Sequence, residues 1–250
     1  MANELEAHGA KRVRLWPKAV DTTEFHPRFA APATRAWLSE GNPQRPPFLY
    51  VGRLSPEKRI DTLRAVLDAM PEARLAIVGG GPSTETLKAH FAGTPAFFAG
   101  YLTGRRLAEA MASASALILP SKTETLGLVL MEAMASGSVV IGANAGGIPD
   151  VIQHEVNGFL YDPDSEAGLT SGLAAVARRV VSEAGLCETM RTNARRQAEE
   201  WSWTAATKQL LGFYQEAIDM PRFEKPKPAK APWMLAMKRA AIGGMKVFLS

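Results

Sequence analysis

From about residue 46 onward the chain alternates short apolar runs with longer stretches of mixed polarity. Most of the short runs lack the polar alternation of a half-exposed strand, so they indicate strands buried on both faces. Such strands, separated by amphipathic helices, are typical of βα units around a parallel sheet. The pattern therefore predicts an α/β domain with a doubly wound parallel sheet. The predicted strands are 48–51, 74–78, 96–98, 116–119, 139–141 and 159–161, and the predicted helices 56–70, 82–91, 104–114, 126–136 and 148–154.

The pattern changes after residue 161, where the strands stop and C-terminal helices follow. These helices are predicted at 164–182, 186–200 and 204–218. Upstream, residues 11–17 predict one more strand, and the Pro- and Ala-rich stretch 27–47 reads as an interdomain linker. The predicted parts are 1–45 as the end of a preceding domain with its linker, 46–219 as the Rossmann-like domain, and 220–250 as a tail.

Charge is concentrated in the tail. The net charge is +4, yet residues 221–250 carry seven Lys or Arg against one acid, so the first 220 residues sum to −2. This distribution disfavours a nucleic-acid-binding body. Residues 233–250 read as an amphipathic helix that is too short and charged to span a bilayer but suits an anionic membrane surface. The alternatives are a disordered tail or one packed on the preceding domain.

Cysteine and histidine usage excludes several classes of site. Cys187 is the only cysteine, which excludes a disulfide framework and a four-cysteine zinc site and indicates a reducing compartment. Four scattered histidines offer no metal-ligand spacing. The N-terminus lacks the features of a signal or transit peptide. The sequence thus favours the cytosol or an organelle matrix and gives no sign of a metal.

The loops that follow the strands are where a doubly wound fold binds its ligand. After the first strand come Gly52, Arg53 and Lys58, whose two cations could clamp a diphosphate. Taken alone, the same residues also fit a solvated turn. Gly146 and Gly147 follow a later strand and allow close backbone approach, though by themselves they are only a turn signal. The loop at 79–82 fails the G-x-G-x-x-G spacing at Thr84, which argues against NAD.

Two glutamates belong to the fourth strand's loop and the helix after it. Glu132 lies among apolar neighbours and needs a partner, which would be the vicinal hydroxyls of a ribose or a backbone group of the protein. Glu124 precedes the helix, whose first N–H groups are free near Leu126 and Gly127 to receive an anion. It could orient sugar hydroxyls there, or serve only as a favourable charge at a helix N-terminus.

Together these residues form the patterns G-R-x(4)-K, at Gly52, Arg53 and Lys58, and E-x(7)-E, at Glu124 and Glu132. In spacing and order they resemble the donor-binding domain of the family 4 retaining glycosyltransferases of GT-B fold. Residues 14–21, 25–27 and 121–128 further resemble the sulfoquinovosyltransferases of sulfolipid synthesis. The chain departs from that pattern at Ala19, where glycine is usual, and at Lys122, where an acid or small residue is commoner.

The resemblance implies a donor site and a reaction. Arg53 and Lys58 would hold the diphosphate and stabilise the departing UDP, Glu124 would hold the sugar, and these three are the catalytic candidates. Glu132 would hold the ribose. The remaining donor-binding candidates are Gly52, Thr125, Leu126 and Gly127, with Gly100, Tyr101 and Leu102 at the uracil. Transfer of sulfoquinovose from UDP-sulfoquinovose to diacylglycerol would retain the anomeric configuration and need no metal or cofactor.

The resemblance also sets the expected context. The partners would be a UDP-sugar donor, a diacylglycerol acceptor and a membrane surface touched by residues 221–250, in the cytoplasm or the plastid stroma. The family's N-terminal domain, which supplies much of the acceptor site, is expected before residue 1, so we expect the chain alone to be inactive. Two alternatives stay open: a UDP-sugar-binding module without transfer, and a lipid glycosyltransferase that uses UDP-glucose or GDP-mannose.

Overall fold

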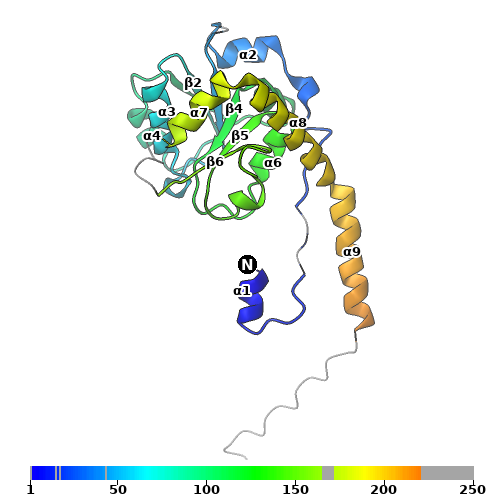
Figure 1. Cartoon of the computed structure of the whole chain (residues 1–250). Coiled ribbons are helices and arrows are strands. Elements are labelled where there is room, and N and C mark those ends of the chain that lie inside the picture. Colours follow the sequence, from blue (N-terminus) through cyan, green and yellow to red (C-terminus); the bar gives the residue numbers. More distant parts are fainter. Residues whose placement is uncertain (1, 15, 17, 43, 165–171, 221–250) are drawn as a thin grey trace, which may run out of the picture. The chain divides into compact units, whose positions relative to one another are not determined.

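The computed structural model describes residues 2–14, 16, 18–42, 44–164 and 172–220 (Figure 1). The predicted amphipathic tail, 221–250, and part of the helix predicted at 164–182 lie outside the described residues. The described residues fall into two units, which divide between residues 210 and 211. The predicted three-part division of the chain stays a prediction.

The sheet has six parallel strands in the order β3-β2-β1-β4-β5-β6. The strands are β1 (Pro47–Val51), β2 (Arg74–Val78), β3 (Ala96–Gly100), β4 (Ala116–Leu119), β5 (Val139–Ala143) and β6 (Phe159–Tyr161). Phe48 of β1 pairs with Leu75 on one side and Ala116 on the other, so β1 and β4 are the adjacent central strands where the winding direction reverses. The predicted doubly wound α/β fold and all six of its strands are confirmed.

Helices pack against the sheet in two groups. The helices are α1 (Ala2–Ala7), α2 (Pro32–Leu38), α3 (Arg64–Ala69), α4 (Thr84–His90), α5 (Gly104–Ser113), α6 (Leu128–Ala135), α7 (Leu173–Ser182), α8 (Ala184–Glu200) and α9 (Trp203–Asp219). α3 contacts α7, which also packs on β5 and β6. α2 contacts α5, α5 contacts α6, and α6 contacts α8. Strands β1, β2, β4 and β5 are almost wholly buried, as their continuous apolar runs predict, whereas the edge strand β3 is only partly buried.

Three predicted elements differ in the structure. The helix predicted at 56–70 is broken into two 3₁₀ turns and the short α3, because Arg59 takes a left-handed conformation (φ 51°). The helix predicted at 148–154 is a single 3₁₀ turn, Ile148–Asp150. The strand predicted at 11–17 is wrong, since its described residues form no strand. The nearest pairing is an isolated bridge of Val20 with Ser202, so those apolar residues have no sheet neighbour.

The Pro- and Ala-rich stretch before β1 contains a helix that the sequence pattern did not predict. Pro32 begins α2. A backbone N–H at this position would have no acceptor within the helix, so proline, which lacks the N–H, costs no hydrogen bond there. Leu38 at the end of α2 is fully buried, and Trp37 packs edge-on against Phe97 of β3 with ring centroids 5.3 Å apart. Residues 32–38 are therefore anchored on the sheet domain.

Candidate functional site

The candidate site residues come from the carboxyl ends of the strands, which meet at one edge because all six strands are parallel. Gly52, Arg53 and Lys58 follow β1, Tyr101 and Leu102 follow β3, and Thr125 follows β4. The predicted residues thus lie on successive loops of this edge, to which the start of α6 also belongs.

A cavity of about 520 Å³ opens between the loops after β1, β2 and β3. Its volume lies within the range of roughly 300–1,000 Å³ that is usual for small-molecule sites. Predicted residues that line it are Gly52, Arg53, Tyr101 and Leu102. The structure therefore brings Tyr101 and Leu102 to one space with Gly52 and Arg53, whereas Lys58 and Gly100 do not line this cavity.

Three consecutive glycines, residues 79–81, also line that cavity. A Cβ on Gly79 would lie 2.0 Å from Gly52 O, and one on Gly81 would lie 2.3 Å from Leu54 O, so larger residues cannot fit without displacing the β1 loop. Leu54 N–H also donates to Gly80 O at 3.0 Å. Sequence reasoning treated residues 79–82 only as a turn. Their triple glycine directly after a strand was the signal that could have assigned them to the site.

Arg53 is the cation of this cavity, and Tyr50 holds the backbone of the loop that carries it. The buried Tyr50 hydroxyl donates to Arg53 O at 3.0 Å, and burial raises the pKa of Tyr50, which keeps the phenol a neutral donor. The Arg53 side chain is exposed, and no ion pair to it occurs within the described residues. Its guanidinium is thus available to an anion.

Tyr101 offers a flat surface to the same cavity. Its side chain is 78% exposed, although it is a large aromatic residue. A Cβ added to Gly80 would lie 2.8 Å from the Tyr101 hydroxyl, so the ring rests against the glycine backbone. A ring supported at one edge and open to solvent can stack on a planar base.

Lys58 meets Glu124 across two loops. Lys58 Nζ lies 2.7 Å from Glu124 Oε2, with 23% and 18% of the two side chains exposed. The pair joins the loop after β1 to the loop after β4, which are 66 residues apart in the chain. Because both side chains are mostly shielded from water, this ion pair is screened less than a surface pair.

The backbone around Glu124 is held by the loop after β5. Gly147 N–H donates to Glu124 O at 2.6 Å, and a Cβ on Gly147 would lie 2.1 Å from Thr125 O. The two glycines of this loop, Gly146 and Gly147, contact the Glu124 loop closely. Gly127 then takes a left-handed conformation (φ 62°) and begins α6 without a side-chain cap. Thr125 and Leu126 beside it are exposed.

Glu132 sits on the second turn of α6 in a desolvated position. Burial, reinforced by the charge of Glu24, raises its pKa to about 7. No hydrogen bond to its carboxylate is made by any described residue, and it does not line the 520 Å³ cavity. The sequence left two possible partners for Glu132, a ribose or a backbone group of the protein, and the described residues do not supply the second. The effect of Glu24 on Glu132 could not be predicted from the sequence pattern.

Lys18 is a second buried charge that sequence reasoning did not assign. Its Nζ is buried without a hydrogen-bond partner in the part of the chain that the structure describes. Burial lowers its pKa, and the charge of Asp150 opposes that shift. Lys18 belongs to the segment 14–21 quoted above for its resemblance, but no spacing rule connected it to the loop after β5.

No helix within the described ranges is long and apolar enough to cross a membrane.

Sequence comparison identifies relatives over most of the chain. Residues 39–197 match the family of glycosyl transferases group 1. The sulfoquinovosyl transferase SQD2 of Arabidopsis thaliana is 41% identical over 207 residues, which cover 82% of this chain and 40% of that protein. A GDP-mannose-dependent alpha-mannosyltransferase of Mycolicibacterium smegmatis is 34% identical over 218 residues, 86% of this chain and 54% of that protein. The chain spans about half the length of these relatives.

Solved structures show the same fold. Sucrose-phosphate synthase from Thermosynechococcus elongatus matches with a TM-score of 0.74 at 27% identity, covering 87% of this chain and 57% of that one. Anabaena HepE in complex with UDP and glucose matches with a TM-score of 0.69 at 21% identity, covering 79% and 55%. The C-terminal domain of a group 1 glycosyl transferase from Francisella tularensis has a TM-score of 0.55 at 21% identity, covering 71% and 95%. This chain therefore belongs to the group 1 (GT4) glycosyltransferases and has the fold of their C-terminal, donor-binding domain.

Proposed function

We propose that the chain binds UDP-sulfoquinovose and forms the donor half of a retaining glycosyltransferase that transfers sulfoquinovose to diacylglycerol. The observation that carries this proposal is the contact of Lys58 Nζ with Glu124 Oε2 at 2.7 Å. It places the residue proposed for the phosphates beside the residue proposed for the sugar. A donor whose diphosphate and sugar are adjacent matches that arrangement.

The proposed roles follow the chemistry of each group. Uracil stacks near Tyr101, beside Gly100 and Leu102, and the diphosphate lies between Arg53 and Lys58, with Gly52 allowing close approach. Glu132 accepts hydrogen bonds from the ribose hydroxyls. Gly127, the N-cap of α6, supplies a free N–H group at the start of the helix, and Thr125 and Leu126 lie directly before it.

Transfer requires the bond between the anomeric carbon and the phosphate oxygen to break. Negative charge then grows on the departing UDP, and Arg53 and Lys58 stabilise it where it develops. Before the donor binds, Lys58 is neutralised by Glu124. The phosphates draw Lys58 toward themselves, which frees carboxylate lone pairs of Glu124 for the sugar hydroxyls.

The choice of donor rests on relatedness. The Arabidopsis relative named as a sulfoquinovosyl transferase is 41% identical, whereas the Mycolicibacterium mannosyltransferase, which is named as GDP-mannose-dependent, is 34% identical. HepE has been seen with UDP and glucose. These relatives make UDP-glucose and GDP-mannose the competing donors.

The acceptor and the setting belong to the same proposal. Diacylglycerol resides in a membrane, so the enzyme must work at its surface, and the basic residues 221–250 would supply a peripheral contact. The plastid stroma or the cytoplasm would be the compartment. Because the chain covers 40% of its Arabidopsis relative, we propose that it binds the donor without completing transfer alone.

Isothermal titration calorimetry with UDP, UDP-sulfoquinovose, UDP-glucose and GDP-mannose tests the donor. We expect UDP-sulfoquinovose to bind more tightly than the other two sugar nucleotides. Arg53→Ala should weaken binding, and Arg105→Ala is the matched control, since Arg105 is an exposed arginine that pairs with Glu109 on α5. Tighter binding of GDP-mannose, or equal affinities in the wild type and Arg53→Ala, would contradict the proposal.

A further inference from the structure

A second cavity lies at the opposite edge of the sheet from the donor site. Ser113 and Ala114 come shortly before β4, and Ser136 and Gly137 come shortly before β5, so these residues mark the amino ends of the strands. The cavity has a volume of about 430 Å³ and is also lined by residues of α2 and α8. It shares no lining residue with the donor cavity.

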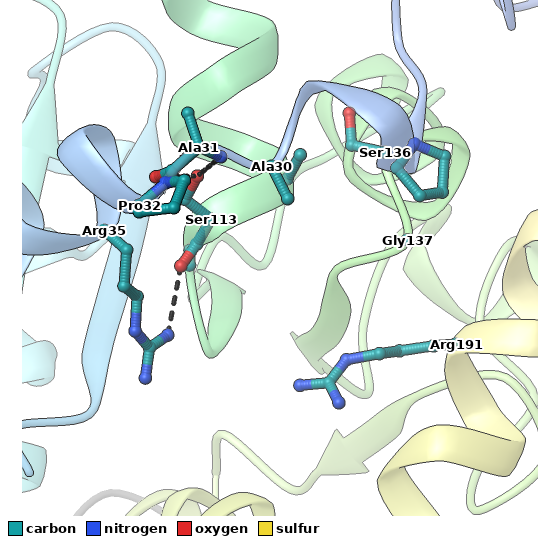
Figure 2. A pocket seen from close by; sticks show the side chains of 11 residues that line it. Ala30, Ala31, Pro32, Arg35, Ser113, Ser136, Gly137 and Arg191 are labelled. Atoms are coloured by element: carbon teal, nitrogen blue, oxygen red, sulfur yellow. Dashed lines mark hydrogen bonds between the residues drawn. The ribbon is translucent and has the colours of Figure 1, made fainter. Parts of the chain in front are cut away.

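Two arginines converge on this cavity. Figure 2 shows Arg35 reaching from α2 and Arg191 from α8 toward the same space. Burial lowers the pKa of Arg35, and the nearby charge of Arg191 lowers it further. No carboxylate forms an ion pair with Arg35 in the described ranges, and Arg191 lies 3.6 Å from a Glu188 side chain that is 75% exposed. Two like charges are thus held together with little compensation.

The existing contacts of the two arginines leave donors unused. Arg35 Nη1 donates to Ser113 O at 3.0 Å and to Ser115 Oγ at 3.1 Å, which caps the end of α5. Arg191 Nη2 makes one long contact, 3.4 Å, with Ser115 O. A guanidinium has five N–H donors, so each side chain retains several. By contrast, Arg195, one turn along α8, uses its guanidinium on backbone carbonyls and on Glu199.

The other walls supply a polar group and apolar surface. Ser136 is 1% exposed, and its hydroxyl has no hydrogen-bond partner among the described residues. Ala30, Ala31 and Pro32 form an apolar side (Figure 2). A buried polar atom without a protein partner is uncommon in folded proteins, and this hydroxyl is available to a ligand.

We propose that this cavity binds a small oxyanion, of the phosphate, sulfate or carboxylate type, between Arg35 and Arg191. The guanidinium fork matches the oxygens of such an anion, and a bound anion relieves the repulsion between the two cations. The ends of α5 and α6 oppose binding with about half a negative charge each, which two full positive charges outweigh. Glu188 is exposed, so solvent screens its charge.

Phosphate titration followed by two-dimensional NMR tests the site. Inorganic phosphate is added to the full chain at constant ionic strength, with chloride as the balancing anion, in the Arg53→Gln background so that the donor cavity does not contribute. We expect saturable shifts of the Ser136 and Gly137 amide signals with a dissociation constant on the order of 1 mM. Arg191→Gln should weaken binding about tenfold or more, the loss expected for one charge-assisted hydrogen bond.

Two further variants separate binding from structural effects. Arg196→Gln removes an exposed arginine of α8 that bonds Asn193 and should bind phosphate like the parent. Arg35→Lys keeps the charge but loses the planar fork, and should bind more weakly than the parent while its other amide signals stay in place. Shifts that fail to saturate, that chloride reproduces, or that Arg191→Gln leaves unchanged would overturn the proposal, whichever sugar nucleotide the donor cavity binds.

Discussion

The raised pKa of Glu132 makes donor binding depend on pH. In the free protein burial and the charge of Glu24 hold this pKa at about 7, so the carboxyl is half protonated near neutrality. Ribose hydroxyls donate to the ionised carboxylate, which binds them better than the acid does. Donor binding should therefore release a proton below pH 7 and tighten as the pH rises through that value.

The size of the effect follows from the ionised fraction. A group with a pKa of about 7 is roughly one-tenth ionised at pH 6 and nine-tenths at pH 8. If only the ionised form binds the ribose, affinity at pH 6 is about tenfold lower than at pH 8, or about 1.4 kcal/mol. Calorimetry with the preferred UDP-sugar measures this effect cleanly, because each of its phosphates carries one ester and one anhydride bond and keeps only a strongly acidic group that does not titrate in this range.

Two variants make the test specific. Glu132→Gln cannot ionise and should give weaker binding with a nearly flat profile between pH 6 and pH 8. Burial is the larger cause of the raised pKa, and Glu24→Gln removes the smaller one, so the midpoint of the binding profile should move to lower pH while staying above the usual value for a glutamate. A wild-type profile as flat as that of Glu132→Gln would refute the assignment of Glu132 to the ribose.

Four further outcomes follow from the account. Arg53→Ala and Lys58→Ala should each weaken UDP binding by about 1.5–3 kcal/mol in calorimetry, and unchanged affinity in both would remove the diphosphate assignment. Glu124→Ala should spare UDP but weaken the UDP-sugar, and equal losses for both ligands would show that its role is wrong. The purified chain should not transfer sugar to diacylglycerol in a radiolabel assay, and turnover would contradict its inactivity alone. The full chain should sediment with anionic liposomes more than a chain ending at Met220, and equal sedimentation would exclude the tail as an electrostatic anchor.

The stability of the free protein tests the raised pKa of Glu132 independently of ligand binding. The folded-state pKa of Glu132, about 7, exceeds its usual value of 4.5, so its contribution is fully present below pH 4.5 and is lost as the pH rises through about 7. The melting temperature of the wild type relative to Glu132→Gln should fall across that window. A constant difference between the two proteins would show that the pKa is not raised.

The strands could be read from the sequence because burial on both faces leaves an unbroken apolar run. β2, β4 and β6 begin and end at the predicted residues. The ends of the helices were harder to predict from the sequence. The left-handed Arg59 breaks one predicted helix, and the backbone conformation of a single non-glycine residue is set by its tertiary surroundings.

Motif spacing predicted the residues of the candidate site that belong to the two sequence motifs. Spacing located Lys58 and Glu124, and the structure joins them. It could not predict that Gly79 packs on Gly52 or that the charge of Glu24 raises the pKa of Glu132, because the approach of these segments depends on the whole fold. The pairing of Arg35 with Arg191 is of the same kind.

A crystal structure of the chain with UDP tests the central claim most directly. The account predicts uracil beside Tyr101 in the cavity of about 520 Å³ and the diphosphate in contact with Arg53 and Lys58. It also predicts that Glu132 accepts hydrogen bonds from the ribose. UDP bound away from the loops after β1 and β3, or a diphosphate that touches neither cation, would contradict it.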